Sequence, residues 1–160
     1  MKTIYFHHAE RNVRKNVSDE LRQLDGITRN GKKEAKLLGK RFKNNNRNVV
    51  AIYTSPYLRC KLTANLINMY LNVPIIEDQR INEWNKNETK YEFLKRNIEF
   101  LKEKDNEYKS NETIICITSG VNLTAFICYF YNIKPTEEIP LVQAFGCSPV
   151  NFVSKNSLVD

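Results

Sequence analysis

The sequence lacks the features that mark several broad classes of protein. Only five glycines and five prolines occur among 160 residues, which excludes collagen-like and linker-rich architectures. No apolar run approaches the ~18 residues of a membrane span, so a membrane is not expected as a partner. Residues 1–6 carry one charge and too short an apolar stretch for a signal peptide. These absences favour a single cytoplasmic domain over residues 1–160.

Cysteine and histidine are also scarce. The four cysteines form no Cys-x-x-Cys pair, so we expect reduced thiols rather than a disulfide framework. The only two histidines, His7 and His8, are adjacent, and on a strand they would point to opposite sides. With no further His or Cys pair to complete a metal site, we expect neither a metal nor another cofactor. The richness in Asn, Lys, Ile and Tyr is typical of an AT-rich bacterial genome.

The formal net charge of +7 comes from 25 Lys and Arg against 18 Asp and Glu. A basic chain suits nucleic acid, an anionic membrane surface or an anionic small substrate. The cations are spaced along helical patterns between leucines, as in residues 32–41, which favours a solvated helix face over a binding surface. Because aromatic and basic residues are not interleaved as in proteins that stack on bases, the sequence disfavours nucleic acid as a partner.

Short apolar runs alternate with longer amphipathic segments. The expected strands are 2–6, 49–54, 73–76 and 113–118, with one or two more within 141–153. The expected helices are 28–42, with Thr28 as N-cap, and 57–70, 89–103 and 121–131. In the helix at 57–70, the spacing predicts that Leu58, Leu62, Leu66 and Met69 face the core. This alternation predicts an α/β fold, a three-layer α/β/α sandwich with a mostly parallel sheet.

Polar residues follow the expected strands, where ligands bind in such folds. These residues are His7, His8, Arg59, Arg80, Glu83, Ser119 and Gly120. Imidazole, guanidinium and backbone N–H groups at helix N-termini together suit an anion, and phosphate is the usual one. The alternative, which the histidines taken alone favour, is that they are ordinary surface residues at the end of a strand.

Four segments resemble the motifs of one family, in the same order. Residues 7–11, His-His-Ala-Glu-Arg, are similar to Arg-His-Gly/Ala-Glu, and residues 27–31, Ile-Thr-Arg-Asn-Gly, to Leu-Thr-x-x-Gly. Residues 54–64, with Ser, Pro, Arg, Thr and Ala in place, match Ser-Ser-Pro-x-x-Arg-x-x-x-Thr-Ala, and residues 80–83, Arg-Ile-Asn-Glu, match Arg-Leu-x-Glu. Over about residues 2–131 the chain therefore resembles the histidine phosphatase superfamily, with its phosphoglycerate mutase-like fold.

The resemblance implies a metal-independent phosphatase that acts on a phosphomonoester or phosphohistidine through a phosphohistidine intermediate. By position, the nucleophile is His8 and the acid that protonates the leaving oxygen is Glu83. The implied phosphate-binding residues are His7, Arg59, Ser119 and Gly120. The implied partner is a phosphorylated small molecule or a phosphoprotein.

Two positions depart from the family pattern. His7 stands where the family has arginine, and Ser119 stands where it has a second histidine. Both changes remove positive charge, and losing one preorganised donor typically costs ~10²–10³ in rate. The sequence therefore indicates either a slow phosphatase or a catalytically inactive domain that binds phosphorylated ligands. A basic nucleic-acid-binding domain is the third and least favoured interpretation.

Two further hypotheses concern the missing charge. If protonated His7 replaces the arginine, phosphate affinity rises as the pH falls while protonated His8 loses nucleophilicity, so turnover peaks in a narrow, acid-shifted window. Alternatively, one of the nearby cations Arg11, Arg14 and Lys15 reaches the site, although the sequence favours a solvated surface position for each. The sequence does not indicate an oligomeric state.

Overall fold

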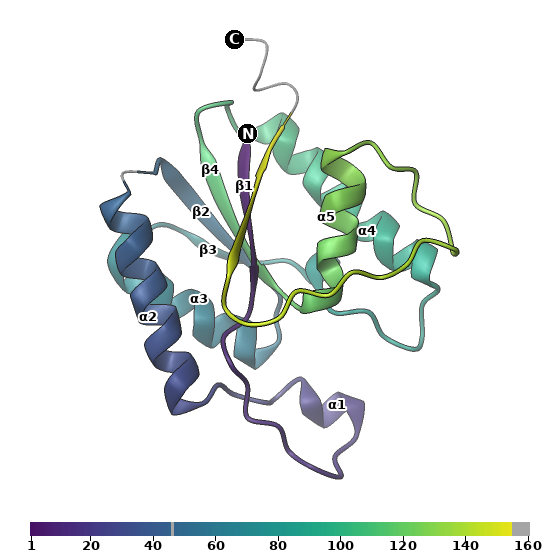
Figure 1. Cartoon of the computed structure of the whole chain (residues 1–160), viewed down its shortest axis with the longest axis horizontal. Helices are drawn as coiled ribbons and strands as arrows, with labels where there is room; N and C mark the ends of the chain where they lie inside the picture. Colours follow the sequence, from purple (N-terminus) through teal and green to yellow (C-terminus); the bar gives the residue numbers. More distant parts are fainter. Residues whose placement is uncertain (46, 155–160) are drawn as a thin grey trace.

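A five-stranded sheet forms the centre of the molecule. In a computed structural model of the chain, which describes residues 1–45 and 47–154, the strands are β1 (Lys2–His7), β2 (Val49–Thr54), β3 (Ile75–Glu77), β4 (Thr113–Thr118) and β5 (Pro149–Val153). Their order is β3-β2-β4-β1-β5 (Figure 1). The first four strands are parallel, and β5 pairs antiparallel with β1 at the edge. The prediction of a mostly parallel sheet is confirmed.

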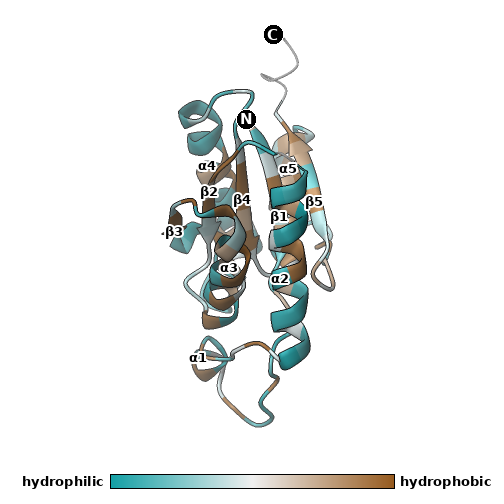
Figure 2. Ribbon diagram, turned by 90° about the vertical axis from the view of Figure 1, so that its left-hand side faces the viewer, coloured by the Kyte–Doolittle hydropathy of each residue, from teal (hydrophilic) through white to brown (hydrophobic). Residues whose placement is uncertain are grey.

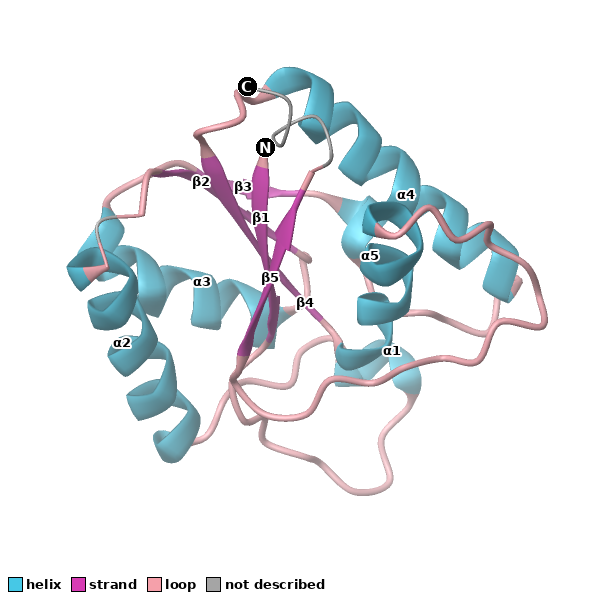
Figure 3. Ribbon diagram, turned by 45° about the horizontal axis from the view of Figure 1, so that its top comes forward, coloured by secondary structure: helices cyan, strands magenta, loops and turns pink. Residues whose placement is uncertain are grey.

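Helices cover both faces of this sheet. They are α1 (Asp19–Arg22), α2 (Arg29–Asn44), α3 (Leu58–Leu71), α4 (Lys90–Glu107) and α5 (Leu123–Phe130), with 3₁₀ turns η1 (Gln79–Ile81) and η2 (Gly120–Asn122). Figure 3 shows α2 and α3 on one side of the strands and α4 and α5 on the other, which confirms the three-layer sandwich. Among the described residues, no helix is long and apolar enough to cross a lipid bilayer.

Successive side chains of β1 enter the two halves of the core because strand side chains alternate between faces. Ile4 and Phe6 lie in the half formed with α2 and α3, where the rings of Phe6 and Phe42 are 6.3 Å apart edge to face. Tyr5 lies in the other half, with its ring centroid 5.0 Å from that of Phe126 on α5. In Figure 2 the central strands β2 and β4 are mostly brown, whereas α2 carries both teal and brown segments, as an amphipathic helix does.

The predicted N-cap of α2 is confirmed, and the same turn contains a glycine, Gly31, that close packing requires. The Thr28 hydroxyl accepts a hydrogen bond from the Gly31 N–H at 2.9 Å. A Cβ at Gly31 would lie 2.6 Å from the Glu10 carbonyl oxygen, so only glycine lets the segment after β1 pass this close to α2. The Thr-x-x-Gly motif therefore fixes the chain that follows His8.

The buried face of α3 differs from the predicted one. Met69 is 65% exposed, and Leu58, Leu62 and Leu66 are only partly buried. The buried residues are Arg59, Cys60, Thr63, Ala64 and Ile67. The prediction was wrong because α2 and α3 approach so closely that a Cβ at Gly39 would lie 2.6 Å from the Ile67 carbonyl oxygen. Small side chains occupy this contact, which displaces the leucines to its edges.

Smaller differences occur at the ends of elements. The third strand is β3 at 75–77 rather than 73–76, the last core helix begins as the 3₁₀ turn η2, and α1 was not predicted. Within the described part of 141–153, one strand forms, β5. The bounds of β2 and β4 agree with the prediction.

Candidate active site

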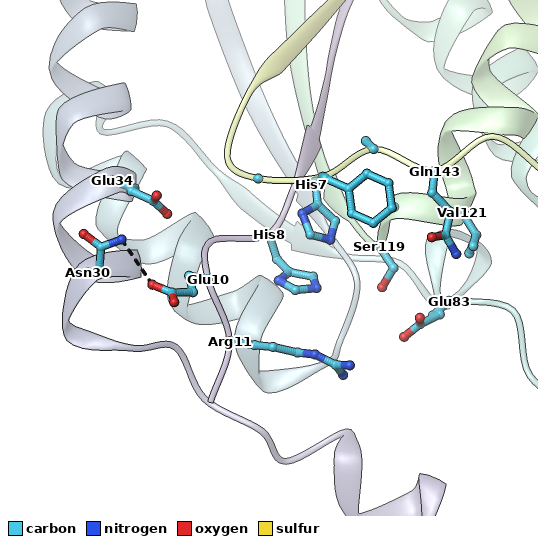
Figure 4. Close-up of a pocket in the computed structure, with 14 residues that line it drawn as sticks. His7, His8, Glu10, Arg11, Asn30, Glu34, Glu83, Ser119, Val121 and Gln143 are labelled. Carbon is cyan, nitrogen blue, oxygen red and sulfur yellow. Dashed lines mark hydrogen bonds between the residues drawn. The ribbon is translucent and has the colours of Figure 1, made fainter. Parts of the chain in front are cut away.

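A cavity of about 610 Å³ opens beyond the carboxyl ends of β1 and β4 (Figure 4). Its lining includes five of the six residues that the sequence assigned to the site, namely His7, His8, Glu83, Ser119 and Gly120. The sixth, Arg59, lines an adjoining cavity and contacts both Glu83 and Ser119. The fold thus brings all six together, as expected where parallel strands end at a change in strand order.

His8 lies directly after β1, with 5% of its surface exposed. Its Nδ1 is 2.8 Å from the Ala9 carbonyl oxygen, which places the Nδ1 proton in that hydrogen bond and leaves a lone pair on Nε2. Burial is the main cause that lowers the pKa of His8 to about 3, and the neighbouring His7, Arg59 and Arg11 lower it further. His8 is therefore neutral at pH 7.

His7 also lines the cavity, with its ring centroid 4.1 Å from that of His8. The expectation that the two rings point to opposite sides was wrong, because β1 ends at His7 and the chain turns after it. Burial lowers the pKa of His7 below its usual 6.5, against a hydrogen bond with the Gly146 backbone that raises it. Both rings are thus neutral at pH 7 in the free protein. A pKa of about 3 places the loss of His8 nucleophilicity at a lower pH than the mildly acidic window that the sequence predicted.

Arg59, in the first turn of α3, is 1% exposed. Its Nη2 donates to the Glu83 carboxylate at 2.6 Å and lies 3.4 Å from the Ser119 hydroxyl, while Nη1 donates to the Arg22 carbonyl at 3.2 Å. The guanidinium lies over the Tyr57 ring, 4.8 Å from its centroid. The Nε of Arg59 is buried and has no hydrogen-bond partner among the described residues. The side chain is thus held rigidly, with an ion pair to Glu83 in front of it.

Arg96 on α4 holds the segment that carries Glu83. Its guanidinium donates to the carbonyl oxygens of Arg80, Asn82 and Glu83 at 2.5, 2.9 and 3.2 Å. It also pairs with the Glu88 carboxylate at 2.6 and 2.8 Å. Three carbonyl oxygens within four residues are therefore bound by one side chain that is itself only 20% exposed.

Residues at the ends of β2 and β4 and in η2 also hold this segment. The Thr118 hydroxyl donates to the Ile81 carbonyl, and the Asn122 amide donates to the carbonyls of Ile81 and Asn82 at 3.3 and 3.0 Å. The Ser55 hydroxyl donates to the Asn82 side chain at 2.6 Å. Because β2, β4 and η2 all contribute, the position of Glu83 is fixed by the sheet itself.

Ser119 and Gly120 close the floor of the cavity. Ser119 is 1% exposed, and the Tyr5 hydroxyl donates to the carbonyls of Ser119 and Gly120 at 2.7 and 3.1 Å. The Ala144 N–H donates to the Gly120 carbonyl at 3.2 Å. A Cβ at Gly120 would lie 2.5 Å from the Ala144 carbonyl oxygen, so this glycine is required by the close approach of the chain after α5.

That later segment, residues 143–146, forms one wall of the cavity. It is fastened by a pair of hydrogen bonds between Thr124 and the backbone of Val142, at 2.8 and 3.2 Å. Gly146 has a φ of +70°, which favours glycine, and Phe145 is 79% exposed at the rim. The sequence reasoning missed this wall, since nothing local in 141–148 indicates its contact with Gly120.

Of the three cations Arg11, Arg14 and Lys15, which the sequence offered as replacements for the missing charge, Arg11 alone reaches the site. Its side chain lies beside His8 and points toward Glu83, and it lines both cavities (Figure 4). The surface position expected for Arg11 was therefore wrong. Arg14 instead pairs with Asp25 at 2.6 Å, and Lys15 lines neither cavity. Arg80 also points away, since it pairs with Asp78 and Glu103.

Carboxylates outnumber cations around the cavity. Among the described residues, its lining contains three carboxylates, Glu10, Glu34 and Glu83, and one arginine, Arg11. Glu10 accepts hydrogen bonds from Thr28 and Asn30 at 2.8 and 3.1 Å, so its charge is partly satisfied at the start of α2. Within residues 1–45 and 47–154, no group of three His, Cys, Asp or Glu side chains is placed to hold a metal ion.

Comparison with known proteins identifies the fold and gives one partial match to a family model. The family model "Histidine phosphatase superfamily (branch 1)" matches residues 25–90, which include Arg59 and Glu83 but not His7, His8 or Ser119. No curated protein gives a significant sequence match.

Solved structures match over most of the chain. The protein histidine phosphatase SixA complexed with tungstate has a TM-score of 0.69 at 15% identity, covering 98% of this chain and 91% of that one. The ecdysone phosphate phosphatase from Bombix mori, also with tungstate, has a TM-score of 0.74 at 16% identity, covering 97% and 90%. A phosphoglycerate mutase from Plasmodium falciparum has a TM-score of 0.57 at 26% identity, covering 83% and 76%. The chain therefore has the phosphoglycerate mutase-like fold of these proteins, and its residues 25–90 are similar to the histidine phosphatase superfamily.

Proposed function

We propose that residues 1–160 form a single histidine phosphatase-like domain that hydrolyses phosphomonoesters or phosphohistidine without a metal, through a phosphohistidine on His8. The observation that carries this proposal is the state of His8: a buried neutral ring whose Nδ1 proton is bound by the Ala9 carbonyl at 2.8 Å. Its Nε2 lone pair is then available in a cavity of about 610 Å³ that accommodates a phosphoryl group.

In the first step, Nε2 of His8 attacks phosphorus, the N–P bond forms, and the bond from phosphorus to the leaving oxygen breaks. Glu83 gives its proton to that oxygen. In the free protein Glu83 is paired with Arg59, so a phosphate must first draw the guanidinium toward itself. The negative charge of the bound phosphoryl group then favours a proton on the neighbouring carboxyl group.

In the second step, water attacks the phosphohistidine, and the N–P bond breaks to release inorganic phosphate. The Glu83 carboxylate takes the proton from that water, which restores the starting state. Throughout, the equatorial oxygens need positive charge, since phosphoryl transfer is catalysed mainly by positioned electrostatics. Arg59 and Arg11 supply that charge, while His7, Ser119 and the Gly120 backbone contribute hydrogen bonds only.

We expect slow turnover for this reason. A neutral His7 cannot form the bidentate contacts of arginine, and the Ser119 hydroxyl carries no charge. Each such loss typically costs ~10²–10³ in rate when uncompensated. Arg11 compensates for part of the missing charge, because it lies beside both histidines at the edge of the cavity.

The comparisons support the reaction class. SixA is a protein histidine phosphatase and the Bombix mori protein is an ecdysone phosphate phosphatase, and both bind tungstate, an oxyanion similar in shape to phosphate. By analogy we propose a phosphorylated small molecule or a phosphoprotein as the partner. We also propose a cytoplasmic location, with which the four unpaired cysteines agree.

The decisive experiment compares p-nitrophenyl phosphate hydrolysis by the wild type, His8→Ala and the control Lys33→Ala, which changes an exposed lysine of α2. We expect the wild type and the control to turn over substrate and His8→Ala to lose at least ~10³ of the rate. Acid-labile phosphate should be trapped on the wild type and the control but not on His8→Ala. Equal rates for wild type and His8→Ala would overturn the proposal.

A second candidate is a domain that binds phosphorylated ligands without hydrolysing them. The observation that favours it is the excess of carboxylates over cations in the cavity lining. In that case phosphate should raise the midpoint of thermal unfolding of the wild type while no hydrolysis is detected. Hydrolysis that depends on His8 would exclude this second function.

A further inference from the structure

A second cavity, of about 560 Å³, adjoins the first. Arg11 and Glu83 line both cavities, so these two side chains form their common border. Figure 4 shows Glu83 and the Arg11 guanidinium on one side of His8, with Asn30 and Glu34 on the other. The second cavity therefore lies on the Glu83 side of the proposed nucleophile.

That placement has a consequence for any phosphate ester. The leaving oxygen must lie within reach of the acid that protonates it, and the rest of the leaving group continues beyond this oxygen. If Glu83 is that acid, the leaving group starts at the border of the two cavities. It then extends into the second cavity, whose volume suits a small organic molecule.

The lining of the second cavity is polar and aromatic. Side-chain amides line it at Gln23, Asn82, Asn85 and Asn87. Tyr57 and Trp84 supply the aromatic surfaces, and the Trp84 indole is held by a hydrogen bond from Nε1 to the Glu88 carbonyl at 3.1 Å. With 39% of its surface exposed, Trp84 presents area that a ligand can cover.

Its cations differ in how far they are neutralised. Arg59 is paired with Glu83. For Arg11 and Lys86, by contrast, no carboxylate of the described residues lies within ion-pair distance. Arg11 stands at the border and Lys86 on the wall of the second cavity. These two charges are therefore available to a ligand that carries a negative group of its own.

We propose that the second cavity is the leaving-group site and that it selects phosphate esters of polar alcohols bearing a further anionic group. This assignment rests on the proposed function, since it takes Glu83 as the acid. The amides hydrogen-bond the hydroxyl groups of the leaving group, Trp84 and Tyr57 cover its carbon skeleton, and Lys86 pairs with its anionic group.

Trp84 also allows a test that does not need turnover, because it is the only tryptophan of the chain. The full-length His8→Ala protein is titrated with inorganic phosphate, glucose 6-phosphate and 6-phosphogluconate while Trp84 emission is recorded. Both are six-carbon phosphate esters with several hydroxyl groups, but 6-phosphogluconate is an open chain with a carboxylate, whereas glucose 6-phosphate is mainly a ring without one. Lys86→Gln therefore isolates the effect of the carboxylate. We expect 6-phosphogluconate to change the emission and to bind about fivefold more tightly than glucose 6-phosphate, as for one exposed ion pair. Inorganic phosphate should leave the emission unchanged and compete with both.

Matched variants separate a local contact from the general attraction of a basic protein for anions. Lys86→Gln should abolish the preference for 6-phosphogluconate, whereas Lys33→Gln, which removes an exposed charge on α2 outside both cavities, should keep it. Equal affinity for the two sugars, unchanged emission with both, or a preference that survives Lys86→Gln would overturn the assignment. Hydrolysis is measured separately on the wild type. If the wild type hydrolyses neither ester but still prefers 6-phosphogluconate, the proposed function is refuted, whereas binding of anionic phosphate esters in the second cavity is not.

Discussion

The protonation of His8 offers the sharpest test of the site. Burial lowers its pKa to about 3, whereas a histidine in the unfolded chain titrates near ~6.5. At pH 5, therefore, His8 stays about 99% neutral in the native protein and only about 3% neutral in the unfolded chain. The unfolded state then binds more protons than the native state, so folding stability falls as the pH falls below ~6.5.

The magnitude follows from this pKa difference. Between pH 7 and pH 5, His8 alone should lower the free energy of unfolding by about 2 kcal/mol, at ~1.4 kcal/mol for each unit that the pH lies below the unfolded pKa. Chemical denaturation of the wild type and His8→Gln at both pH values isolates this contribution. The wild type should lose about 2 kcal/mol more than the variant, because glutamine does not titrate.

Direct titration provides an independent measurement. Since the chain contains only two histidines, the ring Cε1 signals in carbon–proton correlation spectra should number two, and His7→Gln and His8→Gln assign them. We expect the His8 midpoint near pH 3 and the His7 midpoint below 6.5. A His8 midpoint near 6.5, or an identical pH dependence of stability in His8→Gln, would refute the argument that burial keeps the nucleophile neutral.

Three further predictions concern charge, positioning and packing. His7→Arg combined with Ser119→His should raise kcat/KM for p-nitrophenyl phosphate about 10²-fold, and no gain would mean that missing positive charge does not limit the rate. Arg96→Met should lower kcat for alkyl phosphates about tenfold and leave KM within about twofold, because Arg96 positions Glu83 as the acid. The loss should be smaller with p-nitrophenyl phosphate, whose leaving group needs no acid, so equal losses on both substrates would contradict a positioning role. Gly120→Ala should cost about 1–3 kcal/mol in denaturant unfolding because its Cβ would meet the Ala144 carbonyl, whereas Gly26→Ala, with its nearest contact at 3.7 Å, should be nearly neutral.

Local patterns were sufficient to predict much of the fold. The bounds of β2 and β4 agree with the apolar runs, and Thr28 caps α2 as its position before the periodic segment indicates. Such features depend on neighbours within a few residues, which is why a single sequence reveals them. The buried face of α3 did not follow from spacing, because it is set by the close approach of α2 at Gly39.

In the site, too, local motifs were predictable from the sequence and contacts between distant segments were not. His8, Arg59 and Glu83 were singled out from short motifs with fixed spacing, and the structure gathers them at one end of the sheet. The sequence favoured a surface position for Arg11 and missed the wall at 143–146. Arg11 shares a cavity border with Glu83, 72 residues away, and the wall meets Gly120, 24 residues before Ala144. Neither has a local signal.

The sequence by itself therefore determined the succession of the main strands and helices along the chain, the family resemblance and the two positions where positive charge is missing. Only the tertiary structure decided the protonation of His7 and His8, the pairing of Arg59 with Glu83 and the second cavity beside them. The physical reason is that element formation is governed by local backbone and side-chain preferences. Charge states and cavities instead depend on desolvation by groups that are brought together only when the sheet is complete.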